Sequence, residues 1–291
     1  KIYYLRKKII LFIMNTKYCN NCGNYGHTYN NCRHPILSYG IILYKIDKEL
    51  NIPKIVMVER KDSLSFIEFI QIAKEKYDNV KYIQLLISRM TNQEKIKLLN
   101  HTFEDLWNLL WIHLDNVNRK IKKEYDKSKI NFDILKKGFL KENKHISLKK
   151  IIDSVKENYI ENEWEIPKGR RSNHENNKDC ALREFNEETN IEHHNFSIIN
   201  NIIPLIEEYK GINNVRYKHI YYVGVTEKEI DLKIDMKNKN QYTEVKNIAW
   251  LSEKECYDKI RNYDKNKKKI IQDFFELYKN IYTHKKIKIK N

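Results

Sequence analysis

Three glutamates in the second half of the chain have a spacing that could bind a cation. Glu184, Glu187 and Glu188 stand at positions i, i+3 and i+4, so on a helix their carboxylates share one face. Carboxylates this close repel one another, and a bound cation relieves that repulsion. Oxygen ligands of this kind suit hard divalent cations such as Mg²⁺ or Mn²⁺. A Glu-rich helix face that only contacts solvent is the commoner explanation of such a run. The neighbouring residues must therefore distinguish a cation site from a solvent-exposed face.

The residues that precede the three glutamates have the pattern of a loop that leads into a helix. Gly169 ends the run Pro-Lys-Gly, and a glycine there lets the backbone approach closely and offer its carbonyl oxygen. Glu175 follows Gly169 after five residues, and Arg183 follows Glu175 after seven. We expect Arg183 to hold the carboxylate of Glu175 against the helix.

The whole pattern, from Gly169 through Glu175 and the run Arg183–Glu188 to the aliphatic Ile191, resembles the Nudix hydrolase box at almost every fixed position. The one departure is Asn190, where the family usually has glycine. Asparagine is the next-best residue for the left-handed turn expected at this helix end. The resemblance implies hydrolysis of a nucleoside diphosphate linked to another moiety, with divalent cations bound by the box.

Carried over residue by residue, the resemblance assigns roles within the box. Glu184, Glu187 and Glu188 become the metal-binding and catalytic carboxylates, with the carbonyl of Gly169 as a further ligand. Bound cations would neutralise the pyrophosphate charge and lower the pKa of an attacking water. Lys168, beside Gly169, is expected to stabilise the leaving phosphate.

Glu244 is a candidate from outside the box. It stands just before an expected strand that ends near Trp250, and this resembles the position from which decapping Nudix enzymes supply a general base or an extra metal ligand. The alternative is an ordinary surface residue at the start of a strand.

Three stretches of sequence restrict the class of substrate. The approach to the box, Trp164–Gly169 (WEIPKG), resembles mRNA-decapping Nudix enzymes and dinucleoside tetraphosphate hydrolases. Arg60–Phe69 (RKDSLSFIEF) and Met90–Glu94 (MTNQE) resemble the decapping enzymes of large DNA viruses, although residues 71–74 depart from their pattern. This resemblance, over roughly residues 35–284, implies hydrolysis of the triphosphate bridge of capped RNA, releasing methylated guanosine diphosphate and 5′-monophosphate RNA. It also implies action in the host cytoplasm, with packaging in the virion as a further option.

Two other functions stay open at this point. One is a Nudix pyrophosphohydrolase for free nucleotides, dinucleoside polyphosphates or diphosphoinositol polyphosphates. The other is an RNA-binding module without catalytic activity. The sequence does not predict the oligomeric state.

A second group of chemically active residues lies near the start of the chain. The spacing Cys19-x2-Cys22-x4-His27-x4-Cys32, with Gly23 and Gly26 between, resembles the zinc knuckle of RNA-binding proteins. Three thiolates and one imidazole complete a tetrahedral Zn²⁺ site. Such knuckles stack RNA bases on aromatic side chains, and Tyr25 or Tyr29 could do this here. The alternative is a purely structural clip at the start of the Nudix domain.

Composition limits the class of protein without identifying it. The 291 residues carry a formal net charge of +16, which suits a polyanionic partner such as RNA. The mean hydropathy is −0.74 and no apolar run approaches 18 residues, so we expect no membrane span. Five cysteines, three of them in one short stretch, indicate a reducing compartment rather than a disulfide scaffold. The lysines expected to contact RNA phosphates are Lys120, Lys122, Lys123, Lys136 and Lys137.

The elements that must position these groups follow from hydrophobic periodicity. Residues 38–46 and 54–60 predict a strand hairpin, whereas residues 65 to about 159 have helical period and include a capping box at Thr91–Glu94. The remaining predictions are strands over 163–166, 196–209, 215–226 and 244–251, and helices over 177–189, 253–262 and 265–282. We therefore predict an α+β protein: a Nudix α/β/α sandwich with a mixed sheet, an inserted all-helical domain and a small N-terminal zinc knuckle.

The predicted domain boundaries follow the same changes in pattern. They are an extension over 1–13, the knuckle over 14–34, the first part of the Nudix domain over 35–64, the helical insertion over 65–160, the second part of the Nudix domain over 161–284, and a basic tail over 285–291.

Overall fold

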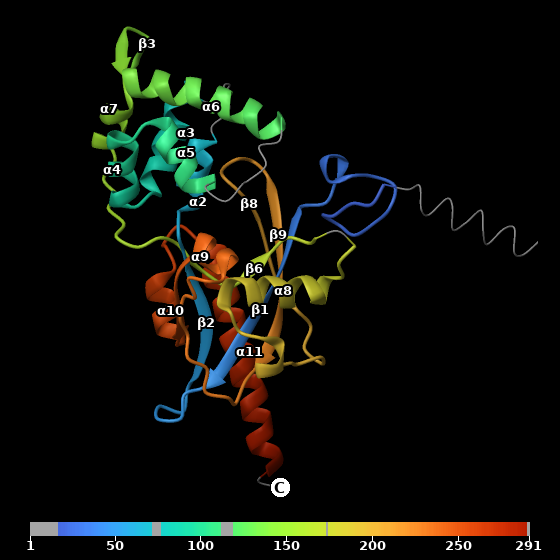
Figure 1. The fold of residues 1–291 in the computed structure, drawn as a ribbon. Helices are drawn as coiled ribbons and strands as arrows, with labels where there is room; N and C mark the ends of the chain where they lie inside the picture. The colour runs from blue at the N-terminus through green and yellow to red at the C-terminus, as the bar shows by residue number, and fades with distance from the viewer. Residues whose placement is uncertain (1–16, 72–76, 112–118, 173, 290–291) are drawn as a thin grey trace, which may run out of the picture. The chain divides into compact units, whose positions relative to one another are not determined.

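The computed structural model describes residues 17–71, 77–111, 119–172 and 174–289, with side chains described for these residues except 119–123 and 282–289. The predicted extension over 1–13 lies outside the described residues. The chain divides into two compact units, one made of residues 1–59 with 164–291 and the other of residues 60–163 (Figure 1). We call them the sheet unit and the helical unit.

The sheet unit is built on a mixed β-sheet. Strand β1 (Ile36–Ile46) pairs antiparallel with β2 (Pro53–Arg60), as the predicted hairpin requires, and parallel with β9 (Arg216–Val225). The strand order is β10-β2-β1-β9-β7, where β10 is Val245–Leu251 and β7 is Ser197–Ile198. Three short partners complete it: β5 (Trp164–Glu165) on β2, β6 (Lys168–Gly169) on β1 and β8 (Leu205–Lys210) on β9. The prediction of a mixed sheet is confirmed.

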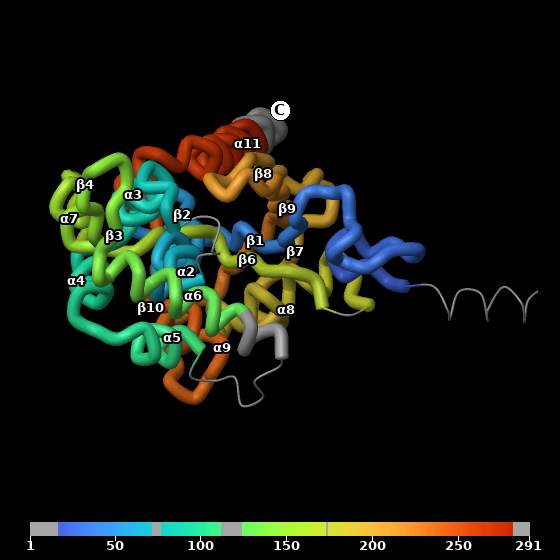
Figure 2. Tube along the Cα trace, turned by 90° about the horizontal axis from the view of Figure 1, so that it is seen from above, coloured from blue at the N-terminus to red at the C-terminus, as the bar shows by residue number. Residues whose placement is uncertain are grey.

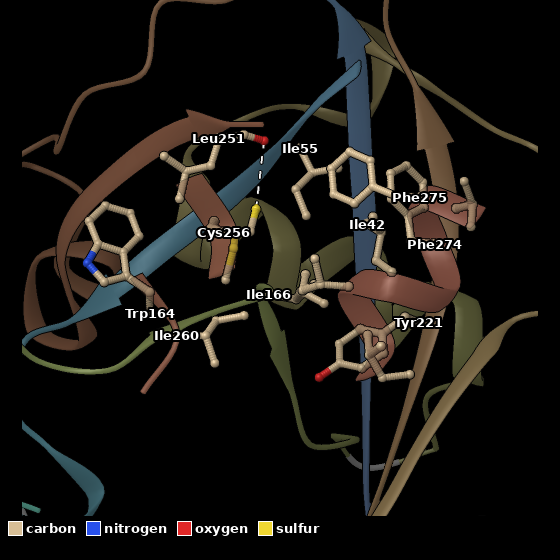
Figure 3. Packing of buried hydrophobic residues seen from close by; sticks show 14 residues of the cluster. Ile42, Ile55, Trp164, Ile166, Tyr221, Leu251, Cys256, Ile260, Phe274 and Phe275 are labelled. Carbon is tan, nitrogen blue, oxygen red and sulfur yellow. Dashed lines mark hydrogen bonds between the residues drawn. The ribbon is translucent and has the colours of Figure 1, made fainter. Parts of the chain in front are cut away.

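Helices cover both faces of this sheet because neighbouring residues of β1 point to opposite sides. Ile41 and Leu43 pack with Phe185 of α8 (Asn177–Thr189) on one face. Ile42 packs on the other face with Phe274 and other residues of α11 (Lys265–Ile289) and of α10 (Glu253–Lys259) (Figure 3). Figure 2 shows α11 and α8 on opposite sides of β1 and β9. The predicted α/β/α sandwich is therefore confirmed.

Helix α8 has the bounds predicted from the sequence, for local reasons. Asn176 is its N-cap, and its side chain accepts a hydrogen bond from the backbone N–H of Asp179 at 2.9 Å. Asn190 ends the helix in the left-handed conformation, with φ of 58°. The asparagine at the family's glycine position thus adopts the backbone conformation that glycine would supply.

The helical unit contains α2 (Leu64–Ile70), α3 (Val80–Ser88), α4 (Asn92–Asn100), α5 (Phe103–Trp111), α6 (Arg119–Lys137) and α7 (Leu148–Asp153). Its helical character is confirmed. It is not all-helical, however, because β3 (Phe139–Lys141) and β4 (Lys144–Ile146) form a hairpin. The two turn residues, Glu142 and Asn143, have φ of 49° and 60°, the pattern of a type I′ turn. The first turn position holds Glu142 rather than the Asn, Asp or Gly typical of such turns, so the hairpin could not be recognised from the sequence.

Glu94 joins two helix starts in the helical unit. The predicted capping box is confirmed, since Thr91 Oγ1 accepts from the N–H of Glu94 at 3.2 Å and Glu94 Oε2 accepts from the N–H of Thr91 at 2.8 Å. The other carboxylate oxygen of Glu94 accepts from the N–H of Ser63, the N-cap of α2, at 2.7 Å. Glu94 is 2% exposed. The two stretches that resemble viral decapping enzymes, 60–69 and 90–94, therefore meet at one buried carboxylate.

Several predicted elements differ in extent. The strand expected over 196–209 is interrupted between β7 and β8, where Pro204 lacks the N–H that a continuous strand needs. Glu244 ends a short helix, α9 (Lys239–Glu244), and β10 begins at the next residue. Helix α11 continues past the predicted end at Tyr282. Among the described residues, no helix has both the length and the apolar character needed to cross a membrane.

Candidate active site and cysteine–histidine cluster

Strand β6 brings Gly169 against the box helix. Gly169 pairs with Tyr39 of β1, and this fixes the loop beside α8. A Cβ atom built on Gly169 would lie 2.0 Å from both Cδ and Oε2 of Glu184. A residue with a side chain at this position would force that carboxylate to move, whereas glycine leaves room for it.

Arg183 is the central cation of the box in this structure. Its Nε and Nη2 donate to the two carboxylate oxygens of Glu175 at 2.8 and 3.0 Å, and Nη2 also donates to the carbonyl of Arg170 at 2.9 Å. Its Nη1 lies 2.9 Å from Glu184 Oε1 and 3.0 Å from Glu187 Oε2. The pairing with Glu175, expected from the spacing, thus ties the loop to α8, and the same guanidinium balances the charge of two box carboxylates.

The pKa of Glu184 is shifted by its surroundings in the box. Burial raises the pKa of Glu184 to about 7; Arg183 opposes this rise, while the charges of Glu187 and Glu244 add to it. Glu184 and Glu187 share the guanidinium of Arg183, whereas Glu244 comes from a different element, the end of α9, and its catalytic role stays a prediction.

Glu188 and Lys168 lie on the inner side of this site. Glu188 is 6% exposed, and its Oε2 accepts from the backbone N–H of Lys168 at 3.0 Å. The ammonium of Lys168 pairs with Glu165 at 2.6 Å, and that carboxylate also lies 3.9 Å from Lys267 of α11. Lys168 must leave this buried pair to reach a phosphate, so its catalytic role stays a prediction.

The box fits a divalent cation by its donor chemistry. Carboxylate oxygens of Glu184 and Glu187 and the carbonyl of Gly169 are hard oxygen ligands. The carboxylate of Glu184 occupies the space beside Gly169 that the Cβ atom of any other residue would fill. Glu184, Glu187, Glu188 and Gly169 are therefore the residues that could hold Mg²⁺ or Mn²⁺, with Glu244 as a further candidate.

The four predicted zinc ligands form a compact cluster. The ligand atoms of Cys19, Cys22, His27 and Cys32 all lie within 4.8 Å of one another, and Cys22 Sγ is 3.4 Å from His27 Nε2. Gly23 and Gly26 have φ of 77° and 100°, as the tight turns require. Burial opposes ionisation of Cys32, but hydrogen bonds from Asn21 and His27 lower its pKa to about 6. Three thiols and one imidazole in this arrangement fit Zn²⁺.

The cluster is attached to the box loop. The ring of Tyr18 stacks on His174 with centroids 4.4 Å apart. Arg171 lies against Gly23, where a Cβ atom would be 2.1 Å from Arg171 Nη1, and its Nη2 donates to the hydroxyl of Tyr39 at 2.8 Å. Arg171 and His174 fall between Gly169 and Glu175, so the knuckle contacts the loop that carries the box. Sequence reasoning missed both residues because neither belongs to a fixed motif position.

The predicted RNA contacts are only partly described. Tyr25 and Tyr29 are 50% and 39% exposed. Lys120, Lys122 and Lys123 belong to α6, but their side chains lie outside the described residues. Lys136 Nζ donates to the carbonyl of His101 and lies 5.3 Å from the centroid of the Phe132 ring, so it is already engaged. Lys137 stands at the end of α6.

Comparisons with known proteins agree with this site. The sequence profile of the family described as NUDIX domain matches residues 144–274. A protein of Acanthamoeba polyphaga mimivirus named "Putative mRNA-decapping protein" is 30% identical over 351 aligned residues, which cover 91% of this chain and 95% of that protein. The mRNA-decapping protein g5R of African swine fever virus (isolate Pig/Kenya/KEN-50/1950) is 26% identical over 253 residues, covering 85% of this chain and 98% of g5R.

Solved structures were matched as well. The crystal structure of a binary complex of a C. elegans Ap4A hydrolase aligns with 84% of this chain and 98% of its own, at 9% identity and a TM-score of 0.42.

Proposed function

The chain belongs to the Nudix family of hydrolases, and from that premise we propose that it is an mRNA-decapping enzyme. It would hydrolyse the triphosphate bridge of capped RNA and release methylated guanosine diphosphate and 5′-monophosphate RNA. Relatives named as mRNA-decapping proteins align with 85–91% of the chain, in both the sheet unit and the helical unit. This full-length similarity favours decapping over a pyrophosphohydrolase that needs only the box.

The observation that carries the proposal is the close approach of the Glu184 carboxylate to Gly169, with Glu187 sharing the guanidinium of Arg183 with it. Divalent cations, when bound, would neutralise the bridge phosphates and lower the pKa of the attacking water. Glu184, Glu187, Glu188 and the Gly169 carbonyl would hold Mg²⁺ or Mn²⁺. Arg183 keeps the two nearer carboxylates in place through its contacts at 2.9 and 3.0 Å.

The proton of the attacking water needs an acceptor, and we assign it to Glu244. Its carboxylate is exposed at the end of α9, whereas Glu184 is half-buried and paired with Arg183, and Glu188 is buried and accepts from the N–H of Lys168. Water oxygen bonds to phosphorus, the bridging P–O bond breaks, and Glu244 takes the proton. The departing phosphate keeps the electron pair of the broken bond.

The cysteine–histidine cluster is proposed to bind Zn²⁺ and to act as part of the sheet unit. Its contacts with Arg171 and His174 support a structural role, and the exposed rings of Tyr25 and Tyr29 support base stacking by RNA. RNA phosphates are proposed to contact the lysines of α6, including Lys137. We place the activity in the host cytoplasm, where capped mRNA is available.

The deciding experiment offers capped RNA, free nucleoside triphosphates, dinucleoside tetraphosphate and a diphosphoinositol phosphate side by side, with Mg²⁺ and with Mn²⁺. We expect release of methylated guanosine diphosphate from capped RNA at the highest kcat/KM. Glu187→Gln is the matched control, since it removes one ligand charge and keeps the shape; it should abolish the release.

If kcat/KM is highest for one of the small substrates, the protein is a pyrophosphohydrolase and the decapping proposal is wrong. RNA binding without hydrolysis of any of the four substrates would favour the non-catalytic module.

A further inference from the structure

The placement of Glu244 is not explained by its own helix. Helix α9 has six residues, and an isolated helix of this length is not stable in water. Residues 227–236, which lead toward it, form no regular helix or strand. The position of Glu244 therefore depends on β10, which begins at the next residue, and on bonds between α9 and its surroundings.

Gln241 supplies three of those bonds. Its side chain is fully buried, and Oε1 accepts from the backbone N–H of Asp235 at 2.7 Å. Its Nε2 donates to the carbonyl of Glu188 at 3.2 Å and to that of Lys233 at 3.4 Å. One amide therefore connects α9, the segment before it and the backbone of a box glutamate.

Asn190 supplies a second connection. Its Oδ1 accepts from Nδ2 of Asn238 at 3.2 Å, and Asn238 is the N-cap of α9, whose own Oδ1 accepts from the N–H of Gln241. A glycine at position 190 could adopt the same left-handed backbone, but it has no side chain to accept this bond. The single departure from the Nudix box thus has a partner in α9.

We propose that Gln241 and Asn190 are positioning residues that fasten α9 to the end of the box helix and so fix where the carboxylate of Glu244 lies relative to the box. We call Asn190, Asn238 and Gln241 the α9 clamp. The inference rests on the proposed function in one respect, the use of Glu244 in hydrolysis.

The alternative is that Gln241 only closes a loop and contributes to stability. The two possibilities differ in a double-mutant cycle. Gln241→Met keeps the length of the side chain and removes its three hydrogen bonds. Glu244→Gln removes the carboxylate on which the α9 clamp is proposed to act. Hydrolysis is measured for both single variants, the double variant and the wild type.

We expect Gln241→Met to lower kcat by at least about tenfold with little change in KM, because a displacement of about 1 Å at a reacting group has effects of this size. In the Glu244→Gln background the same substitution should lower kcat no further. Asn190→Gly, which restores the family residue, should lower kcat by about two- to fivefold, the equivalent of one exposed hydrogen bond.

Thr226→Val is the matched control for stability. The side chain of Thr226 is 4% exposed; its hydroxyl donates to the carbonyl of Asn195 at 2.7 Å and accepts from the N–H of Lys228 at 3.1 Å. The substitution removes both hydrogen bonds and should reduce Tm without reducing kcat. If Gln241→Met does not fold, Asn190→Gly carries the cycle with Glu244→Gln, since its bond is on the surface.

Three results would overturn the proposal: unchanged kcat in Gln241→Met, additive losses in the double variant, or full activity in Glu244→Gln. The cycle is run on whichever phosphoric anhydride the wild type hydrolyses. A wild type that hydrolyses another anhydride but not capped RNA therefore removes the decapping proposal and leaves this test intact. A wild type inactive on all substrates overturns both.

Discussion

Replacing Gly169 with alanine tests whether the close contact between loop and helix is needed for the chemistry. The added methyl group would lie 2.0 Å from Cδ and Oε2 of Glu184, whereas ordinary contact begins at 3.4 Å. The carboxylate must therefore retreat by about 1.4 Å, the difference between these distances. It cannot do so freely, because Arg183 holds it at 2.9 Å.

The size of the effect follows from that displacement. A misplacement of about 1 Å can cost about 100-fold in rate, which corresponds to about 2.7 kcal/mol of transition-state stabilisation. Disturbance of a residue that orients a metal ligand costs about 10- to 100-fold in metal affinity. We expect Gly169→Ala to lose about 100-fold in kcat and to need about 10-fold more Mn²⁺ for half-saturation.

The assay is steady-state hydrolysis of capped RNA across a Mn²⁺ titration, with Tm measured in parallel. Gly224→Ala in β9 is the control, since its methyl group would meet only apolar side chains at 3.3–3.4 Å. This control should keep kcat within about threefold of wild type, which is less than 1 kcal/mol. If Gly169→Ala also keeps kcat and Mn²⁺ affinity within threefold, the position of the Glu184 carboxylate does not govern catalysis and our assignment of the box fails.

Four further predictions concern single groups. Arg183→Lys should lower kcat by about 10- to 100-fold at saturating substrate, because an ammonium cannot replace a guanidinium fork that binds three carboxylates; unchanged kcat would contradict this. Because burial raises the pKa of Glu184 to about 7, protons compete with the cation below that pH. The half-saturating Mg²⁺ concentration should therefore rise steeply from pH 8 to pH 6, by up to about tenfold per unit below 7, and a flat profile would refute this. Glu94→Ala should destabilise the helical unit by about 2–5 kcal/mol in urea unfolding, because two buried N–H groups lose a charged acceptor; a loss below about 1 kcal/mol would show that other acceptors replace it. Cys32→Ser should release Zn²⁺, measured by a chromogenic chelator, and should speed tryptic cleavage at Arg171, which contacts the cluster; unchanged cleavage would mean that the box loop is ordered without the knuckle.

The parts of the fold that depend on local signals could be predicted from the sequence. The bounds of α8 follow from an asparagine at each end, one as N-cap and one in the left-handed conformation. The hairpin of β1 and β2 follows from two apolar β-rich runs separated by a polar segment. The capping box at Thr91–Glu94 follows from four residues. In each case the residues that form the structure are neighbours in the chain.

Features that depend on distant partners could not be predicted. Gln241 has the residue type of a surface position, yet it is fully buried because its three partners come from other segments. Lys168 has the character of a free cation beside the box, but it pairs with Glu165, whose carboxylate also lies 3.9 Å from Lys267 of α11, far along the chain. Helix α9 has no apolar period of its own and exists through tertiary bonds. For β7 and β8, Pro204 was a readable signal that the predicted strand had to break.

The two points where the chain leaves and re-enters the sheet unit determine how the protein could be shortened. Glu59 and Trp164, where the chain leaves and re-enters the sheet unit, are cross-strand partners of β2 and β5. Neighbouring antiparallel strands need only a two-residue connection. The helical unit therefore occupies the place of a hairpin loop, and a splice that joins position 59 to position 164 through Asn-Gly would preserve the strand register.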